Sequence, residues 1–518
     1  MPTYLTPGVY VEEVPSASKP IEGVGTSIAA FVGLAPGGPV NVPMRISNWT
    51  QFARIYGDQN EPDNGPFMPG AYLAHSVYGF FQNGGTLCWI VRVGAGNGDA
   101  PAKMAALPAA SDASAETFRA IAKKAAADAD ISLDLTEETP GKEGTDATYK
   151  LVVTAGDQRE EHDGLTLNPK TKSYIVTKVN SASKLITLED TGASLPAEAR
   201  VPQTGKFALA VPSVPVGDVD PGAFSGDVAK REGLGALAAV DEITMLCIPD
   251  LMTLAKGGDD VHLRDLQGKM LAHCEMAGDR MAVLDAPPNM LPQDILEWRM
   301  NTAGYDSKFA ALYYPWIEVM DPLTNQPMLV PPSGHVAGVW CRTDSTRGVH
   351  KAPANEVVLG ANGLGFQVTH DEQGGLNKVG INCIRSFPGR GIRIWGARTL
   401  SSDPEWRYIN VRRLFNYIAE SIMEGTQWSV FEPNDETLWT QLRLAASNFL
   451  TRTWREGALF GSSPNEAFFV KCDSETNPPD VIEAGQVIIE IGIAPVKPAE
   501  FVIFRISQFT AGAGEVSA

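Results

Sequence analysis

Apolar and polar positions follow more than one pattern along this chain. Near the start, the apolar run "SIAAFVG" leads through a Gly/Pro loop to the helix-like stretch "PGAYLAHSVYGFFQNGG" and then to "TLCWIVRV". From residue 232 onward the same alternation returns, as in "LRDLQGKMLAHCEMAG" followed by "RMAVLDAP". Strands that are apolar throughout and alternate with helices are typical of a parallel sheet covered on both faces. The pattern predicts an α/β domain in two parts, at residues 23–100 and 221–382.

The segment between these two parts has a different pattern. Short runs such as "TYKLVVTAG", "SYIVTKVN" and "SKLITLED" alternate apolar and polar residues and lie between turn residues. Such alternation favours strands that bury one face. We predict an inserted all-β domain at residues 101–220, within which "ASAETFRAIAKKAAADAD" is open between helix and strand.

Residues 383–499 are predicted to form an α+β C-terminal domain. The passage before it, "VPPSGHVAGVWCRTDSTRGVHKAPANEVV", is predicted to be rich in loops, with one short helix-like stretch. A capping box of Ser402 and Glu405 predicts the start of an amphipathic helix, and a second helix starts at "PNDETLW". The apolar stripes of the two helices are Val411, Leu414, Phe415, Ile418 and Ile422 in the first, and Leu438, Leu442, Ala446, Phe449 and Leu450 in the second.

Each end of the chain carries a strand-like stretch that has no hairpin partner nearby. "TPGVYVEEVP" is followed by a polar tether, and Pro495 and Pro498 separate "AEFVIFRISQF" from the strand-like run before it. An unpaired apolar strand must find an acceptor, and adding it to the sheet edge of another copy would satisfy its backbone. We therefore predict terminal arms at residues 1–22 and 500–518. Head-to-tail links of this kind generate a helical polymer or stacked rings.

Composition and charge narrow the class of protein. The chain has 518 residues, of which 44% are hydrophobic and 20% charged, and its net charge is -19. A strongly acidic protein is not expected to bind nucleic acid. The first residues lack the charged and apolar regions of a signal peptide, and no apolar run is long enough to span a membrane. We expect a protein that is made in the cytoplasm and stays soluble there, without direct membrane insertion, and whose six cysteines are reduced and buried.

The sequence contains no motif that indicates an enzyme. Phosphate-binding loops, H-E-x-x-H, C-x-x-C and a complete EF-hand loop are all missing, so we expect no cofactor and no metal. An alternative is a hydrolase that uses Cys341 and His350 as a nucleophile pair. Cys341, beside Trp340 in a run read as an apolar strand, is more typical of a core residue.

A group of arginines in the last third has two interpretations. They are expected on the polar sides of the two long helices, either paired within the helix with Glu405, Glu420 and Glu456 or forming a positive strip for an acidic partner. The residues are Arg407, Arg412, Arg413, Arg443, Arg452 and Arg455.

Several long stretches together resemble one family. They are "TPGVYVEEVPS", "PIEGVGTSIAAFVG", "SKFAALYYPWIEVMDP", "VPPSGHVAGVWCRTDSTRGVHKAPANE", "INCIRSFPGRGIRIWGARTLSSDPEWRYINVRRLFNYIAESI" and "IEIGIAPVKPAEFVIFRISQ". The chain is similar over nearly its whole length to the sheath protein of contractile phage tails and phage-tail-like injection particles. The resemblance is weakest in the insert.

The resemblance implies a non-enzymatic, force-generating polymer with a subtilisin-like α/β core. Stacked six-subunit rings would surround an inner tube protein, end at baseplate and terminal cap proteins, and contract to drive the tube through a target envelope. A static shell with the same arms is the alternative. The C-terminal domain would face the tube, with the arginines as candidate contacts, and the insert would lie outside. Phage tail and injection particle are not distinguished.

The resemblance also implies which residues link the subunits. The N-terminal intersubunit strand would be Val9, Tyr10, Val11, Glu12, Glu13 and Val14. The C-terminal one would lie within residues 501–509 and include Phe501, Val502, Ile503, Phe504, Arg505 and Ile506. The accepting sheet would include Val487, Ile488, Ile489, Glu490 and Ile491.

Overall fold

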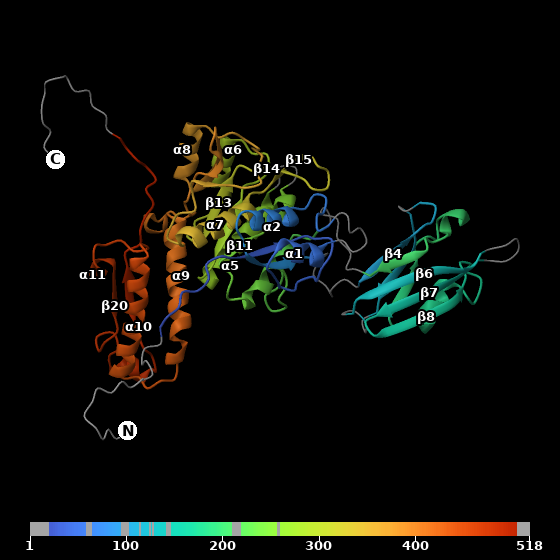
Figure 1. Ribbon diagram of the computed structural model, residues 1–518, viewed down its shortest axis with the longest axis horizontal. Helices are drawn as coiled ribbons and strands as arrows, with labels where there is room; N and C mark the ends of the chain where they lie inside the picture. The colour runs from blue at the N-terminus through green and yellow to red at the C-terminus, as the bar shows by residue number, and fades with distance from the viewer. Residues whose placement is uncertain are drawn as a thin grey trace, which may run out of the picture. The chain divides into compact units, whose positions relative to one another are not determined.

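The structure, a computed structural model, describes residues 20–57, 65–94, 103–112, 115–123, 126, 129–140, 147–209, 219–255 and 260–504 (Figure 1). The predicted strand from Val9 to Val14, together with Arg505 and Ile506, lies outside these residues. The described chain forms two units. Residues 25–346 and 353–407 are called the α/β unit, and residues 20–24, 347–352 and 408–504 the C-terminal unit.

A nine-stranded sheet forms the centre of the described α/β unit, in the order β16-β19-β18-β13-β12-β11-β1-β3-β2. Its parallel strands are β1 (Ile28–Gly33), β3 (Leu87–Arg92), β11 (Met245–Cys247), β12 (Met281–Asp285), β13 (Ala310–Tyr314) and β18 (Ile381–Phe387). Antiparallel strands complete the edges: β2 (Met44–Ile46), β19 (Gly391–Ile394) and β16 (Glu356–Val357). Helix α2 (Leu73–Gln82) lies in the connection between the parallel neighbours β1 and β3, so the predicted strand-helix-strand pattern is confirmed.

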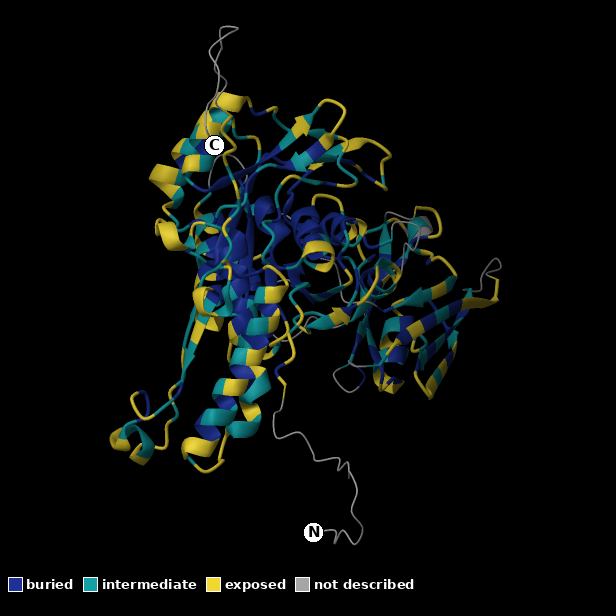
Figure 2. Ribbon diagram, turned by 60° about the vertical axis from the view of Figure 1, so that its left-hand side comes forward, coloured by how far each residue is buried: buried dark blue, intermediate teal, exposed yellow. Residues whose placement is uncertain are grey.

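Helices pack against this sheet, with α5 (Val261–Ala277) against β12 and α2 against β1. The passage predicted to be rich in loops contains a 15-residue helix, α7 (Ser333–Arg347). Every residue from Ser333 to Cys341 is buried, and Figure 2 shows the buried residues in dark blue concentrated in the sheet and its helices. The helix-like stretch predicted in this passage is therefore present but longer than expected, and the strand expected around Trp340 is wrong, because the buried half of this helix has no polar face in its sequence.

A buried carboxylate positions the start of α7. Asp285, at the end of β12, accepts hydrogen bonds from the backbone N–H of Ser333 at 2.8 Å and from the hydroxyl of Ser333 at 2.5 Å. Burial raises the pKa of Asp285 to about 7. The sheet and α7 are therefore joined through a group that titrates near neutrality.

Smaller elements complete the described α/β unit. A three-stranded sheet contains β15 (Pro327–Val330), β14 (Ile317–Met320) and β17 (Gly363–Leu364). The other helices are α1 (Trp49–Tyr56), α4 (Gly222–Ser225), η5 (Gly233–Ala239), η6 (Pro249–Leu254), α6 (Pro292–Glu297), the π-helix η7 (Trp298–Ala303), α8 (His370–Lys378) and η8 (Pro404–Trp406).

The insert holds two antiparallel sheets around a hydrophobic core of its own. One contains β4 (Met104–Pro108), β5 (Glu116–Ala122) and β9 (Ile186–Asp190), and the other β10 (Gly205–Ala208), β6 (Ile131–Thr139), β7 (Thr148–Ala155) and β8 (Gln158–Leu165). Within the stretch left open between helix and strand, residues Glu116–Ala122 form β5. The strand expected at "SYIVTKVN" is wrong, because α3 (Ile175–Ala182) buries Ile175 and Val179 at helical spacing. A 3-10 turn, η3 (Ala197–Arg200), lies between β9 and β10.

Two long helices dominate the C-terminal unit, α9 (Ile409–Thr426) and α10 (Glu436–Arg455), with η9 (Gln427–Ser429) between them. All five inward residues predicted for the second helix are buried. The unit also contains α11 (Pro464–Ala467), β20 (Phe468–Lys471), α12 (Pro479–Glu483) and β21 (Glu490–Ile493). The predicted boundary at residue 383 differs from the structure, because β18 and β19 belong to the nine-stranded sheet and the C-terminal unit resumes at Tyr408.

The entry to α9 also differs from the predicted capping box. Asp403 accepts a hydrogen bond from the N–H of Glu405 at 2.9 Å and so caps the short helix η8. The hydroxyl of Ser402 donates to Asp306 at 2.5 Å instead of to a helix N-terminus. The capping box is therefore wrong, and α9 begins at Ile409, beyond the turn that contains Pro404.

Candidate assembly surface of the C-terminal unit

The small sheet β20–β21 is the described sheet of the C-terminal unit. Its strands are antiparallel, with Phe468 opposite Ile493 and Lys471 opposite Glu490. Among the described residues neither strand pairs with any third strand, so each presents an outer edge. Unpaired edge groups are a template for another strand.

The predicted accepting run from Val487 to Ile491 is only partly in this sheet. Glu490 and Ile491 lie in β21, whereas Val487, Ile488 and Ile489 precede it. Ile488 is held by a side chain: Asn477 accepts from its N–H at 2.6 Å and donates to its carbonyl oxygen at 3.1 Å. The buried side-chain amide of Asn477 therefore makes the backbone hydrogen bonds that the sequence analysis expected Ile488 to make with another strand.

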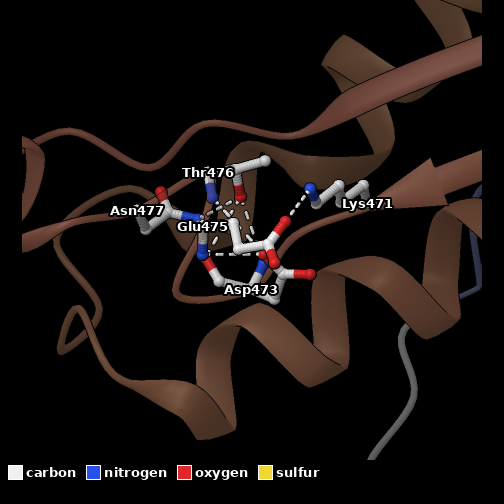
Figure 3. Close-up of polar contacts among 5 residues, drawn as sticks. All are labelled: Lys471, Asp473, Glu475, Thr476 and Asn477. Carbon is white, nitrogen blue, oxygen red and sulfur yellow. Dashed lines mark hydrogen bonds and ion pairs between the residues drawn. The ribbon is translucent and has the colours of Figure 1, made fainter.

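A hydrogen-bonded loop after β20 orients Asn477 (Figure 3). The carboxylate of Asp473 accepts from the backbone N–H of Glu475 at 2.9 Å and of Thr476 at 3.3 Å. The backbone N–H of Asn477 donates to the Asp473 carbonyl at 2.9 Å, and Lys471 forms an ion pair with Glu475. Sequence reasoning missed this loop, although Asp followed by Ser, Glu, Thr and Asn is a turn signal.

The described part of the C-terminal arm is an exposed apolar stretch. Phe501, Val502, Ile503 and Phe504 are between 71% and 83% exposed and lie outside any strand. Four successive apolar side chains without cover are unusual on a solvated surface. The described residues of a single chain therefore provide no apolar surface that covers this stretch.

Two of the six candidate arginines are buried, although both interpretations placed them on the polar side of a helix. Arg412 is 8% exposed and Arg413 4%. Nε of Arg412 donates to Asn416 at 2.7 Å, and burial lowers the pKa of Arg412 to about 10. The polar-face assignment is wrong for this pair because the N-terminal part of α9, from Ile409 to Leu414, is buried on every side.

The other four arginines differ in their contacts. Arg443 is half-buried and donates to the carbonyl of Cys472 at 3.1 Å, next to the loop after β20. Arg452 donates to the carbonyl of Ile21 at 2.6 Å. Arg407 precedes α9 and Arg455 lies in the last turn of α10, and these two arginines and Arg452 are exposed. The structure therefore presents scattered cations instead of one strip.

The nucleophile of the alternative hydrolase pair is buried. Cys341 lies in α7, is 1% exposed, and its Sγ contacts the carbonyl oxygen of Ser27 at 3.4 Å. All six cysteines are free and buried, as predicted. The described residues contain no cluster of metal ligands. No helix in the described part of the chain is long and apolar enough to cross a membrane.

The fold and this surface define a mixed α/β protein whose C-terminal unit has unpaired sheet edges and an uncovered apolar stretch, features typical of assembly proteins. Residues 229–400 match the phage tail sheath protein central domain, and residues 401–509 match the phage tail sheath C-terminal domain. Together the two matches cover more than half of the chain. The chain belongs to the phage tail sheath protein family.

Individual relatives agree with this assignment. The chain is 25% identical to the tail sheath protein of Burkholderia phage BcepMu, over 95% of this chain and 94% of that one. It is 27% identical to a prophage major tail sheath protein of Pseudomonas aeruginosa, and there the match spans 44% of this chain but only 57% of the relative. The contracted helical sheath of the anti-feeding prophage is similar with a TM-score of 0.59 and 25% identity, over 98% of this chain and 100% of that one. These relatives are structural sheath proteins, and the protein is not an enzyme.

Proposed function

We propose that the chain is a force-generating sheath subunit that polymerises as stacked hexameric rings around an inner tube. Contraction of the polymer would drive the tube through a target envelope. The observation that carries this proposal is the similarity, over nearly the whole chain, to a helical sheath in a contracted state. A baseplate and a terminal cap protein are the expected partners at the two ends.

Donor-strand exchange is the proposed link between subunits. Residues 9–14 of one copy and residues 501–506 of another would add to the outer edges of β20–β21 in a third. The two outer edges and the exposed stretch from Phe501 to Phe504 support this link. A strand of six residues adds about six backbone hydrogen bonds, each contributing roughly 0.5–1.5 kcal/mol net. The sum is a few kcal/mol per arm, and repetition along a lattice multiplies it.

Further details of the proposal follow the family. The α/β unit would serve as a subtilisin-like scaffold without a catalytic role. The insert would lie outside, and the C-terminal unit would face the tube. Within that unit Arg455 is an exposed arginine suited to an acidic tube surface, since Arg412 and Arg413 are buried, whereas Arg407 belongs to the α/β unit.

Electron microscopy of the purified assembly tests contraction. Hollow tubes in a long and a short form are expected. Discrete monomers at all concentrations would overturn the sheath proposal, and a single lattice form under every trigger would favour the static shell.

A deletion tests the arms. Removing residues 1–15 should abolish lattice formation while the circular dichroism of the folded core stays unchanged. Removing the small-residue tail at 511–518 is the matched control and should leave assembly intact. Polymerisation of the first variant at the wild-type concentration would refute donor-strand exchange.

A further inference from the structure

The segment that follows the predicted N-terminal strand is packed into the C-terminal unit. Ile21 is 2% exposed and belongs to the hydrophobic cluster formed by α9 and α10, which includes Leu414, Ile418 and Phe449. This segment is about 400 residues away in sequence from those helices. Residues 20–24 therefore belong structurally to the C-terminal unit, although they lead directly into the α/β unit.

Two hydrogen bonds hold the backbone of this segment. Nη2 of Arg452 donates to the carbonyl oxygen of Ile21 at 2.6 Å. The N–H of Val24 donates to the hydroxyl of Ser421 at 3.1 Å, and that hydroxyl donates to the carbonyl of Tyr417 at 2.6 Å. The guanidinium of Arg452 also lies 5.6 Å from the ring centre of Phe449, which restricts its orientation.

Two glycines allow the segment to approach α9 closely. A Cβ at Gly425, inside α9, would lie 2.8 Å from side-chain atoms of Ile21. A Cβ at Gly23 would lie 2.1 Å from the hydroxyl oxygen of Tyr417. Glycine within a helix costs roughly 1 kcal/mol relative to alanine, so close packing of Ile21 is the physical reason for its presence at 425.

We propose that residues 20–24 are a fixed anchor for the N-terminal arm and that Arg452 is its positioning residue. The inference rests on the proposed function for the role of the arm, but the anchor itself rests on the contacts above. It assigns to the exposed Arg452 a role in positioning the arm. The acceptor of the arm is a second copy of this chain.

The anchor limits how far the arm can reach. Residues 15–20 are the six residues between Val14 and the buried Ile21. Seven residue steps span at most about 25 Å when fully extended. The accepting sheet edge of the neighbouring copy must therefore begin within about 25 Å of Ile21 of the donor.

Hydrogen exchange of the full-length protein tests the anchor. R452M retains an unbranched apolar stem over Phe449 but removes the donor to Ile21, so the amides of residues 21–24 should exchange about tenfold faster or more. R455M removes the same charge three residues further along α10 and should leave these amides unchanged. G425A, which places a methyl group against Ile21, should also accelerate their exchange.

The outcomes separate the anchor from the proposed function. Unchanged exchange in both R452M and G425A overturns the anchor, whatever happens to polymerisation. Faster exchange in R452M together with a higher concentration needed for assembly supports it. If removal of residues 1–15 leaves polymerisation intact while R452M still accelerates exchange, donor-strand exchange fails and the anchor stands.

Discussion

The exposed stretch from Phe501 to Phe504 allows a quantitative test of strand donation. In an added strand, alternate side chains point to opposite faces, so Phe501 and Ile503 share one face and Val502 and Phe504 the other. Two double variants separate the faces: F501S/I503S and V502S/F504S. One face is expected to pack on the C-terminal unit of the neighbour and the other to stay near solvent.

The structure sets the size of the effect. All four side chains are at least 71% exposed in the described chain, so nearly their whole apolar surface is available for burial. Complete burial of such a side chain contributes roughly 1.5–3 kcal/mol, so two on the packed face contribute about 3 kcal/mol per link after scaling for exposure. At about 1.4 kcal/mol per factor of ten, the serine pair on that face raises the concentration required for assembly on the order of 100-fold.

Sedimentation of polymer over a range of protein concentrations measures this shift. Because the four side chains are exposed in the single chain, both variants should retain the wild-type circular dichroism and thermal midpoint. One variant should polymerise much less readily than the other. If both polymerise at the wild-type concentration, this stretch is not a donated strand and the reasoning is wrong.

Two further predictions concern stability. The pKa of Asp285 is raised by burial from 3.8 to about 7, so the stability it contributes is complete below about pH 4 and is lost as the pH rises through 7. The free energy of unfolding of D285N relative to that of wild type should therefore rise between pH 4 and 8, by at most about 4 kcal/mol as measured by denaturant unfolding. A difference that does not change with pH would contradict this prediction. Phe431 follows η9 with φ at 67° and is 101% exposed, so F431N should raise the unfolding free energy by about 0.5–1 kcal/mol, since asparagine tolerates a left-handed backbone. A lower thermal midpoint for F431N would show that the ring has a packing role.

The α/β core was predictable because buried strands and their helices leave long apolar runs, as in β1, α2 and β3. Helix α7 was not, since burial of Ser333 to Cys341 on all sides removes the periodicity that marks a helix. Burial of Arg412 and Arg413 was not predictable for a similar reason, because their residue type alone places them on a solvated face.

The candidate surface was predictable only in part. The apolar character of residues 501–504 is visible in the sequence, but the substitution of Asn477 for a strand partner of Ile488 depends on a contact across a loop. The bond from Arg452 to Ile21 joins positions 431 residues apart, and no local pattern indicates it. Long-range polar contacts of this kind are set by tertiary packing instead of local propensity.

The position of Ile21 also determines a mechanical path. A pull that arrives along the N-terminal segment meets Ile21, Arg452 and Ser421 before it reaches β1, so tension enters the α9–α10 pair first. Subunits joined in this way would transmit tensile force from one C-terminal unit to the next.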